Sequence, residues 1–184
     1  MDRIAAVVLA AGEATRFGAP KQRLLLPQVL DRLVRAPIDE IVVVQGAFEL
    51  ELPSYKLLQG IPTRLVACAQ WKRGPGASLR CGLSALATSV DAAVVALADG
   101  PDLSPDAVER VLSAWQTQAG IVAASYAGAR GHPLVLGRTD WDAVPDAGLR
   151  ELVVRLVSCD DLGSPGDIDT PDDLSQSQPA SQPR

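Results

Sequence analysis

The chain has 184 residues, of which 47% are hydrophobic and 21% are charged, and its formal net charge at pH 7 is −5. This length suits one compact domain, and the acidic balance argues against a broad nucleic-acid interface, which needs a basic surface to replace phosphate counterions. No apolar run approaches the roughly 18 residues that span a bilayer, and Met1–Arg3 lead into the first apolar run without a signal-peptide pattern. We therefore expect a cytoplasmic protein with no membrane or nucleic-acid partner.

The first apolar run, Ile4–Leu9, predicts a buried strand that ends in a loop of small residues. Backbone N–H groups in such a loop can approach phosphate oxygens closely. Two cations, Arg16 and Lys21, follow in the same segment. The pattern predicts a triphosphate site, and it is neither a Walker loop nor a G-x-G-x-x-G dinucleotide loop.

Apolar runs then alternate with helical patterns along the chain. Strands are expected at Ile41–Val44, Thr63–Cys68, Ala92–Ala98 and Gly120–Tyr126, and helices at Leu79–Leu86 and Ala107–Trp115. This alternation predicts a largely parallel sheet with helices on both faces. Pro133–Leu136 follows its neighbour too closely for a helical crossover, so we expect an antiparallel strand there and a mixed sheet. Residues 1–174 would form the domain, and the polar residues 175–184 a disordered tail.

Two segments carry the residue types of helix N-termini. Ser104 can cap a helix whose first turn contains Pro105. The other segment begins with glycines at 74 and 76 before a helix whose free N–H groups could hold a nucleobase or ribose. Ser78 in that segment is equally consistent with a pocket residue and with a capping hydroxyl.

Asp99 comes directly after the strand expected at Ala92–Ala98. Ligands of open α/β sheets bind at the carboxyl ends of strands, and Mg²⁺ prefers hard oxygen ligands such as carboxylates. Asp99 is therefore a candidate metal ligand. The sequence Asp-Gly-Pro-Asp is also common in turns, so these residues alone leave both interpretations open.

A second pair of carboxylates, Asp167 and Asp169, lies near the C-terminus. In an extended segment two residues apart share a side, so one or both could face a cation. Thr170-Pro171 is also a good helix start, which is the structural alternative.

The scarce residue types narrow the chemistry further. His132 is the single histidine, which excludes multi-histidine metal sites. Arg130, close by, carries a guanidinium that pairs well with phosphate oxygens. The three cysteines are few, odd in number and widely separated, so we expect reduced thiols at Cys68, Cys81 and Cys159.

The segment Leu9–Lys21 resembles the signature L-A-[AG]-G-x-x-x-R-[MF]-G-x-x-K of the MobA-like NTP transferase family, which includes the molybdenum-cofactor guanylyl- and cytidylyltransferases. Four further segments resemble family motifs in the same order: Gly74–Leu83 (G-x-x-x-S-L-x-x-G-L), Leu97–Pro101 (G-D-x-P), Arg130–Pro133 (R-G-H-P, as in the cytidylyltransferases) and Asp167–Leu174 (D-I-D-T-P-E-D-L). Ala98 and Gly100 depart from the residues that the family often has there. After Lys21 the chain looks shorter than many members, since Gln22–Pro27 lead almost directly into the apolar run Val29–Val34.

This resemblance implies a three-layer α/β/α Rossmann-like nucleotidyltransferase fold with a mostly parallel mixed sheet. It implies catalytic roles for Lys21, Arg16 and Asp99, and Mg²⁺ ligation by Asp99 and Asp169, the second of the two C-terminal carboxylates. Nucleotide would be bound by Leu9, Ala10, Ala11, Gly12, Arg16, Lys21, Gly76, Ser78 and Asp99. The acceptor would lie near Gly100, Arg130 and His132.

The predicted function is transfer of a nucleoside monophosphate from an NTP to a phosphorylated acceptor, with release of pyrophosphate. Ala11, where the family's guanylyltransferases carry glycine, favours CTP, and the resemblance implies molybdopterin as the acceptor and a molybdenum hydroxylase as a partner. One alternative keeps the chemistry but uses a sugar phosphate or a phosphorylated hydroxy acid, with GTP as a further donor. Another is a non-catalytic nucleotide-binding maturation factor for a molybdenum hydroxylase. The intact Lys21, Asp99 and Asp169 argue against it.

Overall fold

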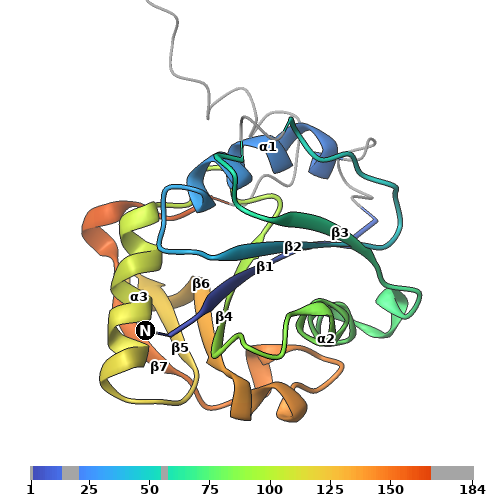
Figure 1. Cartoon of the computed structure of the whole chain (residues 1–184). Coiled ribbons are helices and arrows are strands. Elements are labelled where there is room, and N and C mark those ends of the chain that lie inside the picture. The colour runs from blue at the N-terminus through green and yellow to red at the C-terminus, as the bar shows by residue number, and fades with distance from the viewer. Residues whose placement is uncertain (1, 14–20, 55–57, 167–184) are drawn as a thin grey trace, which may run out of the picture.

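The computed structural model describes residues 2–13, 21–54 and 58–166, which form a sheet flanked by helices (Figure 1). The strands are β1 (Ile4–Ala10), β2 (Glu40–Gln45), β3 (Thr63–Ala67), β4 (Ala92–Leu97), β5 (Val122–Tyr126), β6 (Ala129–Gly137) and β7 (Arg155–Ser158). The helices are α1 (Lys21–Leu33), α2 (Pro75–Ala85) and α3 (Pro105–Thr117). Short 3₁₀ helices lie at η1 (Trp71–Arg73), η2 (Arg138–Ala143), η3 (Leu149–Glu151) and η4 (Asp160–Leu162).

The sheet has the strand order β3-β2-β1-β4-β6-β5-β7. β1 pairs in parallel with both β2 and β4, and β2 pairs in parallel with β3. β6 is antiparallel to β4 and to β5, whereas β5 and β7 are parallel. The sheet is therefore mixed and mostly parallel, as predicted, and the strand expected at Pro133–Leu136 is indeed antiparallel.

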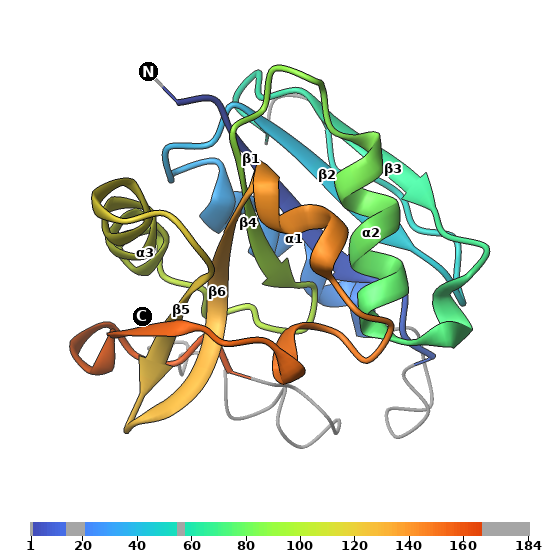
Figure 2. The same ribbon diagram turned by 90° about the horizontal axis from the view of Figure 1, so that it is seen from below.

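Helices cover both faces of the sheet because its central strands are apolar on both sides. Alternate residues of β1, β2 and β4 pack against α1 and α3 on one face and against α2 on the other. The segment 138–151 covers the second face beside α2, as Figure 2 shows. This is the three-layer α/β/α arrangement, and the apolar runs at β1 and β4 are buried as a parallel sheet requires.

Element ends reflect local chemistry. α3 begins after Ser104, whose Oγ accepts a hydrogen bond from the backbone N–H of Ala107 at 3.4 Å, which confirms the predicted cap. α2 begins at Pro75, earlier than the apolar spacing alone predicted, because a proline fits the first turn of a helix.

The segment after Lys21 is helical, whereas the sequence suggested a short connection. α1 starts at Lys21 and contains Pro27, with its apolar side chains buried in the core. A proline removes one helical hydrogen bond, and the buried apolar face at Leu25, Leu26 and Val29 outweighs that loss.

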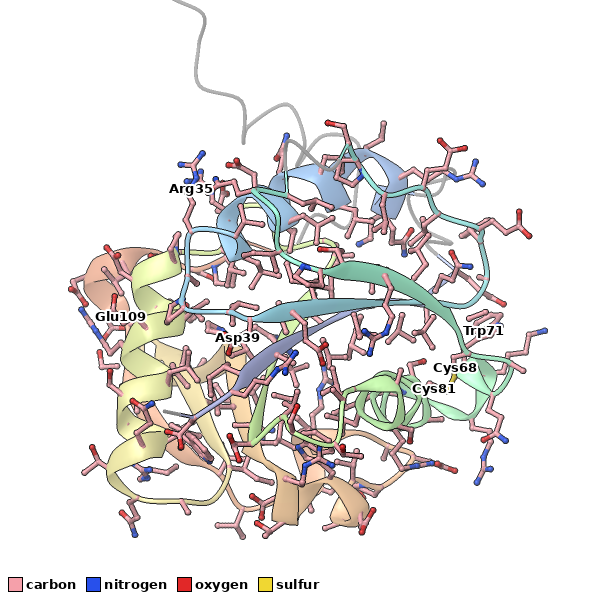
Figure 3. All side chains as sticks on the ribbon, in the orientation of Figure 1. Arg35, Asp39, Cys68, Trp71, Cys81 and Glu109 are labelled. Atoms are coloured by element: carbon pink, nitrogen blue, oxygen red, sulfur yellow. A yellow bond between two sulfur atoms is a disulfide. The ribbon has the colours of Figure 1, made fainter. Side chains whose placement is uncertain are left out.

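The expectation of three reduced cysteines is wrong for two of them. Cys68, just after β3, and Cys81, on α2, form a disulfide with a Cα–Cα distance of 5.8 Å (Figure 3). Only Cys159 is a free thiol, and it is buried. The sequence could not reveal the pairing, because the turn through η1 is what folds α2 back onto the end of β3.

Within the described ranges, no helix is both long and apolar enough to cross a membrane. Arg16, Asp167, Asp169 and the expected tail at 175–184 lie outside the described residues.

Candidate active site

Lys21 and Asp99 meet at the carboxyl ends of β1 and β4. These two strands pair in parallel, with Leu9 opposite Leu97, so the loops that follow them leave the same edge of the sheet. Lys21 is the first residue of α1, and its Nζ lies 3.0 Å from Oδ2 of Asp99. The Lys21 side chain is only 7% exposed, against 24% for Asp99. A buried ammonium group needs a charged or hydrogen-bonding partner, and Asp99 supplies one.

The loop after β1 is fixed through its carbonyl oxygens. Leu9 accepts a hydrogen bond from the N–H of Ala98, and Ala11 accepts one from the N–H of Ala47. Nε2 of Gln22 donates to the carbonyl oxygen of Gly12 at 3.1 Å. The predicted nucleotide-binding segment Leu9, Ala10, Ala11 and Gly12 is thus tied to β4, to the end of β2 and to α1.

Gln22 is a site residue that the sequence analysis missed. Its side chain is buried, and its Oε1 has no hydrogen-bond partner although it is shielded from solvent. A polar residue beside Lys21 at the start of an otherwise apolar helix face was the available signal. Only the folded chain shows that it holds the Gly12 carbonyl.

The segment 163–166 packs beside the loop that follows β4. Gly100 is buried, and a side chain there would meet Pro165 at 3.3 Å. The N–H of Asp102 donates to the carbonyl oxygen of Pro165 at 3.0 Å. The last described residues, up to Gly166, therefore pack against the loop that carries Asp99. Asp169, the second predicted metal ligand, lies outside the described residues.

Metal-ligating side chains are sparse at this edge. The described residues contain no group of three or more His, Cys, Asp or Glu side chains suited to a metal ion. Mg²⁺ commonly uses one or two carboxylates and completes its shell with water and substrate phosphates. The partly exposed carboxylate of Asp99 fits that kind of site.

The N-terminus of α2 is packed against a neighbouring loop. The N–H of Gly76 donates to the carbonyl oxygen of Asp146 at 3.0 Å, and a side chain on Gly76 would collide with the carbonyl oxygen of Pro145. Gly74, not Ser78, is the N-cap residue, so the capping alternative for Ser78 is wrong. Ser78 is buried inside the first turns of α2.

Asp146 fixes this loop through two arginines. Nη2 of Arg73 lies 2.8 Å from Oδ2 of Asp146, and Arg80 pairs with Oδ1 of the same carboxylate. Hydrogen bonding to Arg80 and Arg73 lowers the pKa of Asp146. The loop between η2 and η3 is therefore anchored both to η1, through Arg73, and to α2, through Arg80.

Trp71 is a second residue that the sequence analysis did not select. A side chain at Gly46 would lie 2.7 Å from Cγ of Trp71 and 2.8 Å from Cβ of Ala11, so Trp71 and Ala11 crowd the same glycine. Figure 3 shows Trp71 close to the Cys68–Cys81 disulfide. An aromatic ring after β3 thus packs beside Ala11, in the loop that follows β1.

Arg130 and His132 belong to β6, which neighbours β4 on the side away from β1. Burial lowers the pKa of His132 to about 4, while the charge of Asp99 acts in the opposite direction. Arg130 donates from Nη2 to the carbonyl oxygen of Leu149 at 2.7 Å. Burial and the nearby charge of Arg150 lower the pKa of Arg130. The fold thus brings the ends of β4, β6 and η3 close to His132, whose imidazole is neutral at pH 7.

Residues 6–158 match the family model of the MobA-like NTP transferase domain. This range includes all seven strands, apart from the first two residues of β1. The chain belongs to the MobA-like NTP transferase family. No curated protein matches it. The chain is therefore a nucleotidyltransferase by family and by fold. Its candidate site lies at the strand ends where Lys21 and Asp99 meet.

Solved structures agree with this assignment. The homologue of Mycobacterium tuberculosis Rv0371c from Mycobacterium sp. strain JC1 is 27% identical, with a TM-score of 0.74 over 95% of this chain and 94% of that chain. Rv0371c from M. tuberculosis H37Rv, solved in complex with manganese, is 26% identical, with a TM-score of 0.69 over 95% of this chain and 97% of that chain. The 4-diphosphocytidyl-2C-methyl-D-erythritol synthase of Anaerococcus prevotii DSM 20548 shares the fold at 16% identity and a TM-score of 0.68, over 96% of both chains.

Proposed function

We propose that this chain transfers a nucleoside monophosphate, CMP from CTP, to the phosphate of molybdopterin and releases pyrophosphate. The observation that carries the proposal is the contact between Lys21 and Asp99 at the ends of β1 and β4. A cation for the triphosphate and a carboxylate for a metal lie there within 3.0 Å of each other, beside a loop of small residues. That combination suits nucleotidyl transfer, which needs positioning and charge neutralisation more than covalent chemistry.

In the proposed reaction an oxygen of the acceptor phosphate attacks the α-phosphorus of the NTP in line. A bond forms between that oxygen and the α-phosphorus, while the bond to the pyrophosphate oxygen breaks. Lys21, together with Arg16, stabilises the charge that develops on the phosphates. The acceptor phosphate is already ionised near neutral pH, so no side chain has to act as a general base. Backbone N–H groups of the Ala10–Gly12 loop bind and orient the nucleotide.

Magnesium is the proposed metal, held by Asp99 and Asp169. The carboxylate of Asp99 is a hard oxygen ligand at a strand end, and its partial exposure leaves it accessible. A bound divalent ion would neutralise charge on the triphosphate and align the leaving pyrophosphate. The manganese complex of Rv0371c, which is 26% identical, supports divalent-metal binding in this chain.

The choice of CTP rests on Ala11 and the choice of molybdopterin on the R-G-H-P segment, both through family resemblance. A sugar phosphate is the alternative acceptor. The similarity to 4-diphosphocytidyl-2C-methyl-D-erythritol synthase and to a CMP:2-keto-3-deoxy-manno-octonic acid synthetase favours keeping it under test, since both names describe cytidylyl transfer. A molybdenum hydroxylase is the proposed recipient of the product.

The test is an assay with each α-labelled NTP, Mg²⁺ and either molybdopterin or a panel of sugar phosphates. We expect pyrophosphate and a cytidine dinucleotide with CTP and molybdopterin. Product with a sugar phosphate alone would replace the acceptor but keep the chemistry. NTP binding without turnover on any acceptor would refute the enzyme hypothesis and favour a non-catalytic maturation factor.

A further inference from the structure

The disulfide between Cys68 and Cys81 closes a segment that carries both Trp71 and the beginning of α2. Residues 69–80, which lie between the two cysteines, contain η1 and the first turns of α2. Figure 3 shows the two cysteines and Trp71 together at one end of the molecule. A crosslink between the end of β3 and α2 restricts how far this segment can move from the sheet.

The ring of Trp71 packs against the turn that holds the loop after β1. A side chain at Gly46 would lie 2.7 Å from Cγ of Trp71 and 2.8 Å from Cβ of Ala11, so the glycine separates them with no room for a side chain. The next N–H, of Ala47, donates to the carbonyl oxygen of Ala11 at 3.2 Å. Trp71 also packs against the apolar cluster that includes Ala11. Because this packing is close, a displacement of the ring would leave Ala11 without support on that side.

The polar contacts of η1 restrain it less firmly than the disulfide does. The N–H of Trp71 donates to the carbonyl oxygen of Cys68, and the N–H of Gly74 to that of Trp71, so both bonds stay within one short turn. The ion pair of Arg73 with Asp146 reaches another part of the chain, but the Arg73 side chain is 58% exposed. Exposed ion pairs contribute little, because water screens them. Loss of the covalent bond would therefore free Trp71.

The two ends of the segment are anchored independently of the disulfide. The N–H of Cys68 donates to the carbonyl oxygen of Gln45 at 2.9 Å, at the end of β2. On α2, Arg80 pairs with Asp146, and the N–H of Gly76 donates to the carbonyl oxygen of the same residue at 3.0 Å. Breaking the bond should therefore leave the fold in place and give freedom mainly to η1 between these anchors.

The surroundings of the two cysteines suit exchange with an external dithiol. Cys68 is buried, whereas Cys81 is partly exposed and is the cysteine open to attack. Sγ of Cys68 lies 3.7 Å from the carbonyl oxygen of Ala77, in the first turn of α2. In the reduced chain the thiol of Cys68 can donate to that oxygen, so the buried sulfur keeps a polar partner. The packing around Cys68 is thus compatible with both redox states.

We propose that the Cys68–Cys81 bond is a reversible redox site whose state sets the order of the loop after β1, and through it the affinity for nucleotide. A thiolate of an external dithiol attacks Sγ of Cys81, the bond to Cys68 breaks, and Cys68 leaves as a thiolate that takes up a proton. The second thiol of the dithiol then attacks the mixed disulfide and releases Cys81, so the reductant becomes a disulfide as the chain gains two thiols. An external disulfide reverses both steps. The consequence for nucleotide rests on the proposed function.

The first test compares oxidised and dithiothreitol-reduced protein by amide hydrogen exchange, without nucleotide. Alkylation and mass spectrometry of the unfolded chain count the free thiols: Cys159 alone in the oxidised protein, and all three cysteines in the reduced protein. Reduction should speed exchange in residues 9–13 and 69–74 about tenfold and leave β5 and β6 unchanged. Unchanged exchange in residues 9–13 would overturn the inference, and so would loss of the circular dichroism signal on reduction, since the bond would then only maintain the fold.

The second test measures CTP affinity by isothermal titration. Reduction should weaken CTP binding about tenfold, within the usual range of coupling between two sites. By reciprocity, saturating CTP should raise by the same factor the ratio of reduced to oxidised dithiothreitol that half reduces the protein. Equal CTP affinities of the two redox forms would overturn the control of affinity.

Two variants sharpen this comparison. Cys68→Ser/Cys81→Ser should bind CTP as weakly as the reduced wild type and ignore dithiothreitol. Cys159→Ser lacks only the buried free thiol, so it is the matched control and should respond to reduction as the wild type does. Absence of CTP binding in both redox forms of the wild type would refute the proposed function, and the exchange experiment would still decide the inference about the loop.

Discussion

The two sides of the candidate site balance their charges in different ways. At the ends of β1 and β4, the ammonium of Lys21 and the carboxylate of Asp99 neutralise each other at 3.0 Å. On the β6 side, Arg130 donates to the carbonyl oxygen of Leu149 and has no carboxylate partner among the described residues. A ligand at the first side must replace a contact between opposite charges, whereas one at the second side would meet a cation held only by a backbone carbonyl. Donor nucleotide and acceptor should therefore respond differently to mutation, salt and metal.

The largest effect is expected where the balanced pair is broken. Lys21→Ala should lower turnover about 10²- to 10³-fold, because a positioned charge that stabilises the transition state is lost. Steady-state rates with saturating NTP and acceptor measure this. Arg23→Ala is the matched control on the same helix, since Arg23 is exposed and its guanidinium donates to the carbonyl oxygen of Glu49. Near-wild-type turnover in Lys21→Ala would remove the ion pair from the proposed mechanism.

The disulfide links the end of β3 to α2, on the Lys21–Asp99 side of the candidate site, and β6 carries no cysteine. Cys68 and Cys81 are 13 residues apart, and closing a loop of that size contributes about 3 kcal/mol in the chain-entropy model. Cys68→Ser/Cys81→Ser should lower the free energy of unfolding by about that amount in urea titrations. A reducing agent should destabilise the wild type and leave the double variant unchanged, with Cys159 present in both. Equal sensitivity of the two proteins to reductant would show that the bond does not form.

Metal and nucleotide should bind cooperatively, because each takes one member of the Lys21–Asp99 pair. Metal alone would draw the Asp99 carboxylate away from the Lys21 ammonium, and nucleotide alone would place phosphates beside that carboxylate. We expect nucleotide to raise Mn²⁺ affinity by about 5- to 150-fold, the usual range of such coupling. Electron paramagnetic resonance of free Mn²⁺ measures it. Lys21→Met should raise Mn²⁺ affinity without nucleotide, and an unchanged affinity would argue against competition between the ammonium and the metal.

The smallest expected effect is the pH response of His132. Its folded pKa, about 4, lies below the unfolded value of 6.5, so between these values the unfolded chain binds more protons. The stabilisation is complete above pH 6.5 and is lost as the pH falls toward 4, by about 1–2 kcal/mol after allowing for partial exposure. Urea unfolding of wild type and His132→Gln between these pH values isolates the contribution.

The chain has a single histidine, so one imidazole signal in NMR reports its titration directly. Asp99→Asn should lower the pKa of His132 further, since the carboxylate raises it. A pKa near 6.5 in the wild type would mean that the imidazole is solvated, and it would contradict the buried position of His132 near Asp99.

Much of the fold could be predicted because its signals are local. The apolar runs of β1, β2 and β4 are buried on both faces and carry no competing pattern. The cap at Ser104 and the antiparallel β6 follow from a few neighbouring residues. β7 was missed because it is four residues long and only partly buried.

Site residues divide in the same way. Lys21, Asp99, Arg130 and His132 were selected from their residue types and motifs, and the folded chain brings them to one edge of the sheet. Gln22 and Arg150 were missed, because a glutamine beside a lysine or an arginine on a short turn is common on any protein surface. Their surroundings are visible only in the folded chain: Gln22 donates to the carbonyl oxygen of Gly12, and Arg150 follows Leu149, whose carbonyl oxygen accepts from Arg130.

The sequence by itself determined the alternation of strands and helices, the family signature and the chemistry available at each strand end. Only the tertiary structure decided which of those groups meet: Lys21 with Asp99, Cys68 with Cys81, and Arg130 with the carbonyl oxygen of Leu149. Strand and helix patterns depend on neighbours a few positions away, which any sequence displays. Contacts between residues tens of positions apart depend on strand order and on the packing of loops over the sheet, which the chain acquires only when it folds.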